Sequence, residues 1–137
     1  MKTIKLVYII HSPVEKVWQA LVDPKLIDAW GAGPAIMDDQ VGSKFSLWGG
    51  DIHGTNKEVE EHERLVQEWY GGKWPKPSTV SITLMPDKDG TRIILNHEGI
   101  PDEDYKSIND GWDSYYFGAI KSFLESQTAE RDFSNRL

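Results

Sequence analysis

The sequence predicts an α+β domain in which a curved antiparallel sheet of seven strands wraps around a long C-terminal helix, with two short helices after the first strand. Three observations support this class. The chain opens with an alternating apolar segment that is followed at once by two helix starts. Its middle, residues 34–99, is divided into short apolar segments by glycine and proline turns. Residues 102–125 then carry an aromatic pattern of helical period.

The N-terminal third is predicted to form one strand and two helices. Residues 2–10 alternate imperfectly between apolar and polar side chains, which is typical of a strand covered mainly on one face. A Ser-Pro pair follows, and Ser12 is expected to cap a short amphipathic helix over residues 14–22. An Asp-Pro pair then starts a second helix over residues 25–30, which Gly31 ends. This helix pair is expected to close one end of the sheet.

The middle of the chain is predicted to form six further strands. The candidate segments are 35–38, 44–48, 53–60, 64–70, 79–85 and 91–98. They are separated by short turns rich in Gly, Pro and Asp. Connections this short favour an antiparallel meander, because parallel neighbours need a long crossover.

Residues 102–125 are predicted to form a helix with one broad aromatic face. Relative to Trp112, the residues at helical spacing on that face are Tyr105, Ile108, Tyr115, Tyr116, Ala119 and Phe123. The opposite side is a stripe of small residues, namely Ser107, Gly111, Ser114, Gly118 and Ser122. The aromatic face is expected to lie across the sheet, either as ordinary core or as the wall of a cavity. The stripe is either a solvent face or a contact for a second subunit, so a monomer and a homodimer both stay open.

Composition excludes several classes of partner. The net charge of −7 argues against nucleic acid and anionic membranes, because both require a basic surface. The chain has no cysteine, which excludes disulfides and thiolate metal sites and agrees with a cytoplasmic location. The apolar start is too short for a leader, and no segment is apolar for long enough to span a bilayer. We expect one domain over residues 1–126 and a polar tail over residues 127–137.

Aromatic residues and one histidine form the candidate ligand site. Six Trp and five Tyr exceed what a small core needs, and such rings commonly wall cavities. The predicted ligand-binding residues are those expected to face the space between sheet and C-terminal helix: Trp30, Phe45, Trp69, His97, Trp112, Tyr115 and Tyr116. A pocket of this kind suits a small planar or lipid-like molecule. The alternative is that the same rings pack against each other and leave no room.

The titratable residues carry no catalytic or metal signature. His97 is expected on the helix side of its strand, where it either orients a ligand or is hydrogen-bonded to the long helix or to the turn at residues 99–101. His53 and His62 lie near glutamates, but their spacing matches no zinc pattern and favours a solvated acidic face. No Gly-x-Ser-x-Gly elbow is present. The sequence therefore predicts no catalytic residue, no metal and no cofactor.

Several short motifs occur in a characteristic order along residues 3–125. They are SPVEKVWQAL at 12–21 with Asp23, Pro24 and Trp30, VGSKF at 41–45, Gly54 with residues 58–59, RLVQEW at 64–69, GTR at 90–92, HEGIP at 97–101, GW at 111–112 and IKSFL at 120–124. In this order they resemble the helix-grip superfamily of START-like and birch-pollen-allergen-like domains (SRPBCC). Within it they resemble the homologues of the activator of the ninety-kilodalton heat-shock-protein ATPase. The acidic segment 58–63 departs from that pattern.

The resemblance implies the helix-grip fold and admits three functions. The first is a non-enzymatic binding domain that holds a small apolar or lipid-like ligand between sheet and helix. The second is a protein-interaction module related to the chaperone activators, with a chaperone as partner. The third is an enzyme such as a cyclase or hydrolase, for which His97 together with Tyr115 and Tyr116 is the candidate acid or base.

Overall fold

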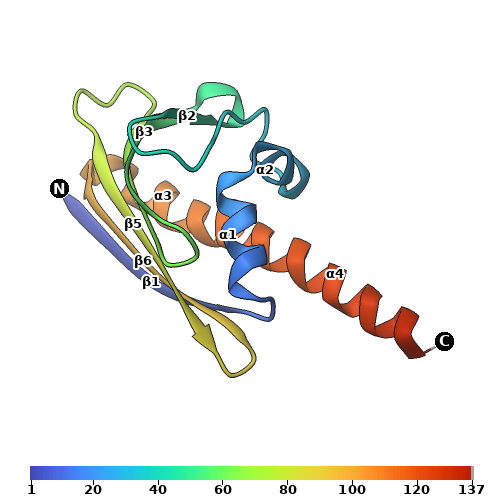
Figure 1. Ribbon diagram of the computed structural model, residues 1–137. Helices are drawn as coiled ribbons and strands as arrows, with labels where there is room; N and C mark the ends of the chain where they lie inside the picture. The colour runs from blue at the N-terminus through green and yellow to red at the C-terminus, as the bar shows by residue number, and fades with distance from the viewer. Residues whose placement is uncertain (137) are drawn as a thin grey trace.

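A six-stranded antiparallel sheet curves around the C-terminal helix, and two short helices lie beside that helix at one end (Figure 1). The computed structural model describes the backbone of residues 1–136 and the side chains of residues 1–127. Its elements follow the predicted order of one strand, two helices, a run of strands and a long helix. The predicted α+β class and helix-grip arrangement are therefore confirmed.

The strands form one continuous ladder. They are β1 (Lys2–Ile10), β2 (Lys44–Leu47), β3 (Ile52–Glu60), β4 (Arg64–Gly71), β5 (Ser78–Asp87) and β6 (Gly90–Ile100). Their spatial order is β1-β6-β5-β4-β3-β2, and every neighbouring pair is antiparallel. Leu65, Ile82 and Leu95 pair across three neighbouring strands and are fully buried. The inner face is thus built by alternation, as the pattern predicts.

The predicted strand at residues 35–38 is wrong as a strand. Ile36 makes only an isolated bridge to Ser46, so the sheet within the described residues has six strands instead of seven. The segment turns away because side chains satisfy its backbone. The amide of Asn56 donates to the carbonyl oxygens of Asp38 and Gln40 at 3.0 and 3.2 Å. These bonds replace the ladder that a strand would need.

The two short helices are α1 (Val14–Val22) and α2 (Pro24–Trp30). The cap of α2 is confirmed, because Asp23 accepts a hydrogen bond from the backbone N–H of Lys25 at 2.9 Å. Gly31 ends α2 at a φ of 115°, in the left-handed region that glycine tolerates. The cap predicted for α1 is wrong. Ser12 is buried, its hydroxyl has no hydrogen-bond partner, and the N-cap position falls on Pro13.

The C-terminal helix contains a π-helical turn. A 3₁₀ turn η2 (Asp102–Asp104) leads into α3 (Tyr105–Gly111), then the π-helix η3 (Trp112–Phe117), then α4 (Gly118–Arg136). A π-turn inserts one extra residue, so the positions after it rotate by one. The buried face continues from Trp112 through Tyr116, Phe117, Ile120 and Leu124. The predicted continuation through Ala119 and Phe123 is therefore wrong by one residue, and both side chains are only partly buried.

Gly118 lies where the π-turn returns to α-helix. A Cβ atom built there would collide with the carbonyl oxygen of Asp113, so the close approach at this turn requires glycine. Beyond it, α4 runs to Arg136, and the backbone of the predicted polar tail is helical up to that residue. Side chains from residue 128 onward lie outside the described residues. In the described part of the chain, no helix combines the length and hydropathy needed to span a bilayer.

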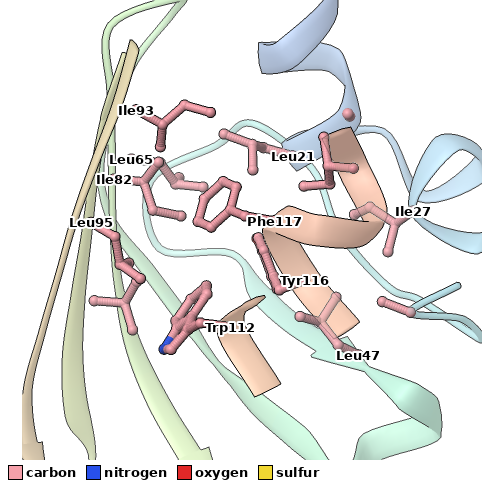
Figure 2. Close-up of a cluster of buried hydrophobic side chains, with 14 of the residues drawn as sticks. Leu21, Ile27, Leu47, Leu65, Ile82, Ile93, Leu95, Trp112, Tyr116 and Phe117 are labelled. Carbon is pink, nitrogen blue, oxygen red and sulfur yellow. The ribbon is translucent and has the colours of Figure 1, made fainter. Parts of the chain in front are cut away.

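The core lies between the concave sheet and the π-turn (Figure 2). Phe117 points into the space between Leu21 of α1 and the sheet residues Leu65 and Ile82, as Figure 2 shows. Trp112 and Tyr116 extend from the same turn toward Leu95 and Leu47 (Figure 2). All of these side chains are at most 2% exposed. The π-turn therefore delivers three large rings to the centre of the domain.

Candidate ligand-binding site

The buried rings form one connected aromatic cluster. Its centre is the stacked pair Trp69 and Trp112, with ring centroids 4.7 Å apart. Tyr116 packs on Trp112 at 4.6 Å and on Trp30 at 5.0 Å. Phe45 lies 6.3 Å from Trp69 at the other side of the pair. Five of the predicted site residues are thus gathered from α2, β2, β4 and the π-turn into a single cluster.

The indole N–H groups of this cluster are all hydrogen-bonded. Trp30 donates to the carbonyl oxygen of Ala20 at 2.8 Å. Trp69 donates to the side chain of Gln67 at 2.8 Å, and Gln67 in turn donates to Asn56 at 2.8 Å. The third indole, that of Trp112, donates to His97. Because buried polar groups cost free energy unless they are paired, these bonds fix the orientation of each ring.

His97 is a fully buried link between the sheet and the π-turn. Its Nδ1 accepts the hydrogen bond from Trp112 Nε1 at 3.0 Å. An indole nitrogen only donates, so the imidazole proton must reside on Nε2. Nε2 then donates to Ser78 Oγ at 2.7 Å, and that hydroxyl donates to the carbonyl oxygen of Trp69 at 3.1 Å. The histidine is thus hydrogen-bonded to the long helix, which is the second of the two predicted alternatives.

Burial also keeps His97 neutral. Desolvation lowers its pKa from the ordinary 6.5 to about 4. Both ring nitrogens are already committed, so the imidazole has neither a lone pair nor a proton to offer a reactant. The geometry gives His97 a positioning role toward Trp112.

The cluster is not filled completely. A cavity of about 350 Å³ lies between the β2–β3 end of the sheet and the start of the C-terminal helix. Its walls are almost entirely apolar and consist of Trp48, Ile52, Trp69, Ser107, Ile108, Gly111, Trp112, Tyr115 and Tyr116. It is reached beside the 3₁₀ turn η1 (Trp48–Gly50) and α3. Volume and lining fall within the range of small-molecule pockets.

Four of the seven predicted residues line this cavity. Trp69, Trp112 and Tyr116 form its inner wall, and Tyr115, which is 68% exposed, stands at its rim. The other three, Trp30, Phe45 and His97, are buried in the cluster and are not among the lining residues.

Sequence reasoning did not single out the remaining lining residues, which are Trp48, Ile52, Ser107, Ile108 and Gly111. A signal for two of them was present. Ser107 and Gly111 belong to the small-residue stripe, and they lack the bulk to fill the space beside Trp112. The stripe is thus divided, because Ser114 and Ser122 do not line the cavity, whereas Ser107 is an exposed residue that does.

Tyr116 is the one inner-wall residue with an uncommitted polar group. Its side chain is 2% exposed, and its hydroxyl makes no hydrogen bond with any residue in the described part of the chain. Desolvation raises the pKa of this phenol well above its ordinary value of 10.0. The hydroxyl is therefore neutral and remains a proton donor.

Metal chemistry has no support in the described side chains, which contain no group of three His, Asp or Glu residues placed to hold an ion. His53 stacks on Tyr70 with ring centroids 5.4 Å apart. His62 lies edge-on to Trp18 at 6.5 Å. Both histidines thus make ring contacts at the surface of the domain.

Comparison with known proteins places these features in a family. Residues 11–125 match the family model described as Activator of Hsp90 ATPase homolog 1-like protein. Among curated proteins, the human activator of 90 kDa heat shock protein ATPase homolog 1 is 28% identical over 109 residues, which cover 78% of this chain and 32% of the human protein. The chain spans about a third of the length of the curated relatives it matches.

Solved structures share the whole fold. A Mesorhizobium loti protein matches with a TM-score of 0.80 at 27% identity, covering 91% of this chain and 98% of that chain. An HSP90 activator from Plasmodium falciparum matches with a TM-score of 0.83 at 24% identity, covering 91% of this chain and 97% of that chain. The second likeness supports the fold alone.

Proposed function

We propose that this chain, which belongs to the family of Activator of Hsp90 ATPase homolog 1-like proteins, is a non-enzymatic binding domain that holds a small planar apolar molecule in the cavity beside the π-turn. The observation that carries the proposal is the cavity itself. Protein interiors are normally packed as densely as organic crystals. An apolar pocket of about 350 Å³ with aromatic walls is therefore a departure from close packing that suits a small molecule.

The size of the cavity restricts that occupant. An engineered apolar cavity of about 150 Å³ binds benzene. The space beside the π-turn, about 350 Å³, is a little more than twice as large and suits two or three fused rings. A sterol or a long acyl chain would extend out of it. Trp69, Trp112 and Tyr116 supply an aromatic wall against which such rings can pack.

Binding can be measured with the protein's own tryptophans, because Trp48, Trp69 and Trp112 line the cavity. The panel is fatty acids, sterols, flavonoids and naphthalene-type aromatics, followed by fluorescence quenching and thermal shift. We expect saturable quenching and a raised melting temperature with the two- and three-ring aromatics, since a ligand of the folded state stabilises it. Absence of any response across the panel would contradict the proposal.

Substitution of Gly111 provides a sharper prediction. This glycine lines the cavity, has helical φ and ψ angles, and leaves open space around the position of a Cβ atom. Gly111→Leu is therefore expected to fill the cavity and abolish binding. The same change is expected to stabilise the unliganded domain by about 1 kcal/mol, because glycine disfavours helix.

Ser114→Leu on the exposed side of the same helix is the matched control, and it should leave binding unchanged. Retention of full affinity by Gly111→Leu would place the ligand elsewhere.

A second candidate function is interaction with a chaperone. It is supported by the family and by relatives whose names describe them as activators of the 90 kDa heat shock protein ATPase. The test is the ATPase rate of a purified chaperone of that class with and without this protein. Stimulation that persists in Gly111→Leu would support a surface interaction independent of the cavity. An unchanged rate would contradict this candidate.

A further inference from the structure

We propose that the Tyr116 hydroxyl anchors the ligand, and that the ligand is therefore a two- or three-ring aromatic compound bearing a hydrogen-bond acceptor such as a carbonyl group. This inference rests on the proposed function of the cavity. It adds a chemical class to the ligand and assigns one residue the role of recognising it.

Tyr116 is surrounded by other aromatic rings. Its ring is enclosed by Trp30 at 5.0 Å, Trp112 at 4.6 Å, Phe117 at 4.9 Å and Trp69 at 6.0 Å. These contacts bury the ring, and the side chain as a whole is 2% exposed. Its hydroxyl gains no hydrogen bond from any described residue. The hydroxyl is not one of the fully enclosed polar atoms that lack a partner in the described residues, so it is accessible from the cavity, where a ligand acceptor can take the place of water.

Competing donors on the inner wall are already committed. The indole N–H of Trp69 donates to Gln67, and that of Trp112 donates to His97. At the rim, the hydroxyl of Ser107 donates to the carbonyl oxygen of Asp104 at 3.2 Å. Tyr115 is 68% exposed, so water satisfies its hydroxyl. On the described inner wall, Tyr116 is therefore the donor that remains for a ligand.

The protonation state of Tyr116 determines that its hydroxyl acts as a hydrogen-bond donor. Desolvation holds the pKa of the Tyr116 phenol far above neutral pH, so the group stays protonated. A neutral phenol placed against an apolar ligand prefers to donate its proton to an oxygen or a ring nitrogen. An anionic ligand is disfavoured, because no described cationic side chain lines the cavity. The geometry thus favours a neutral acceptor such as a ketone.

The experiment compares two ligands of the same shape. 2-Acetylnaphthalene carries a carbonyl oxygen, and 2-isopropylnaphthalene has a methyl group in its place. Their dissociation constants are measured by calorimetry and tryptophan quenching for the wild-type protein, Tyr116→Phe and the rim control Tyr115→Phe. We expect Tyr116→Phe to weaken the binding of the ketone by about five- to tenfold and to leave the affinity for the hydrocarbon nearly unchanged. Tyr115→Phe should change neither.

The outcomes separate the anchor from the cavity. If both naphthalenes bind and Tyr116→Phe retains full affinity for the ketone, the anchor is overturned and the cavity proposal stands. If neither binds the wild-type protein, both proposals fail. Folding is controlled by the melting temperature, which we expect to be unchanged or raised in Tyr116→Phe because the hydroxyl has no partner to lose. A loss of ketone affinity in Tyr115→Phe alone would assign the hydrogen bond to the rim.

Discussion

Lowering the pH from 7 to 5 is expected to destabilise the folded domain, with a limiting slope of about 1.4 kcal/mol per pH unit that originates from His97. The imidazole is fully buried, and its pKa is about 4 in the folded chain against an ordinary value of 6.5. Between these values the unfolded chain binds a proton that the folded chain does not. The contribution of His97 to the free energy of unfolding is therefore fully present above pH 6.5. It is lost as the pH falls toward 4, by about 3 kcal/mol over the full window.

Urea unfolding at pH 7, 6 and 5, followed by circular dichroism, measures this slope. The range stops at pH 5 because Asp102 and Glu125, whose pKa values are lowered, titrate further down. His97→Asn keeps an oxygen acceptor near the Trp112 indole but cannot titrate, so its stability should be nearly independent of pH. His53→Ala, at an exposed position, should retain the wild-type slope. A slope that persists in His97→Asn would assign the effect to other groups.

Local signals account for what the sequence predicted well. The Asp-Pro pair before α2 and the glycine after it act through a cap and a left-handed turn, which depend on neighbouring residues alone. The strands alternate because the sheet has one buried face. The prediction for residues 35–38 failed because Ala35 and Asp38 bond to the side chains of Asp28 and Asn56, and only Ile36 pairs with a strand.

The candidate site depends on features that periodicity does not contain. The π-turn shifts the buried face by one residue, and its requirement for Gly118 becomes visible only when the carbonyl of Asp113 is in place. A helical wheel therefore selects Ala119 and Phe123 where the chain buries Ile120 and Leu124. Similarly, aromatic content predicts rings at the centre of the domain, but the cavity is the small difference between their volume and the space that the sheet encloses.

Trp112→Ala is expected to lower the free energy of unfolding by about 4 kcal/mol. The side chain is 2% exposed and stacks on Trp69. Its removal leaves a large void and also strips Nδ1 of His97 of its donor. Urea unfolding by circular dichroism measures the loss, with Tyr115→Ala at the exposed neighbouring position as the control that should change stability by less than about 0.5 kcal/mol.

A second substitution separates the hydrogen bond from the packing. Trp112→Phe keeps an aromatic ring but has no N–H. It should lower the free energy of unfolding by about 1–3 kcal/mol beyond the effect of the smaller ring, because a His97 nitrogen is left unpaired. In a His97→Ala background that extra cost should disappear, because there is no acceptor left to satisfy. Additive losses in the double variant would mean that Trp112 and His97 stabilise the domain independently. Coupled losses would establish that the Trp112–His97 hydrogen bond fixes the π-turn, and with it the cavity wall, to the sheet.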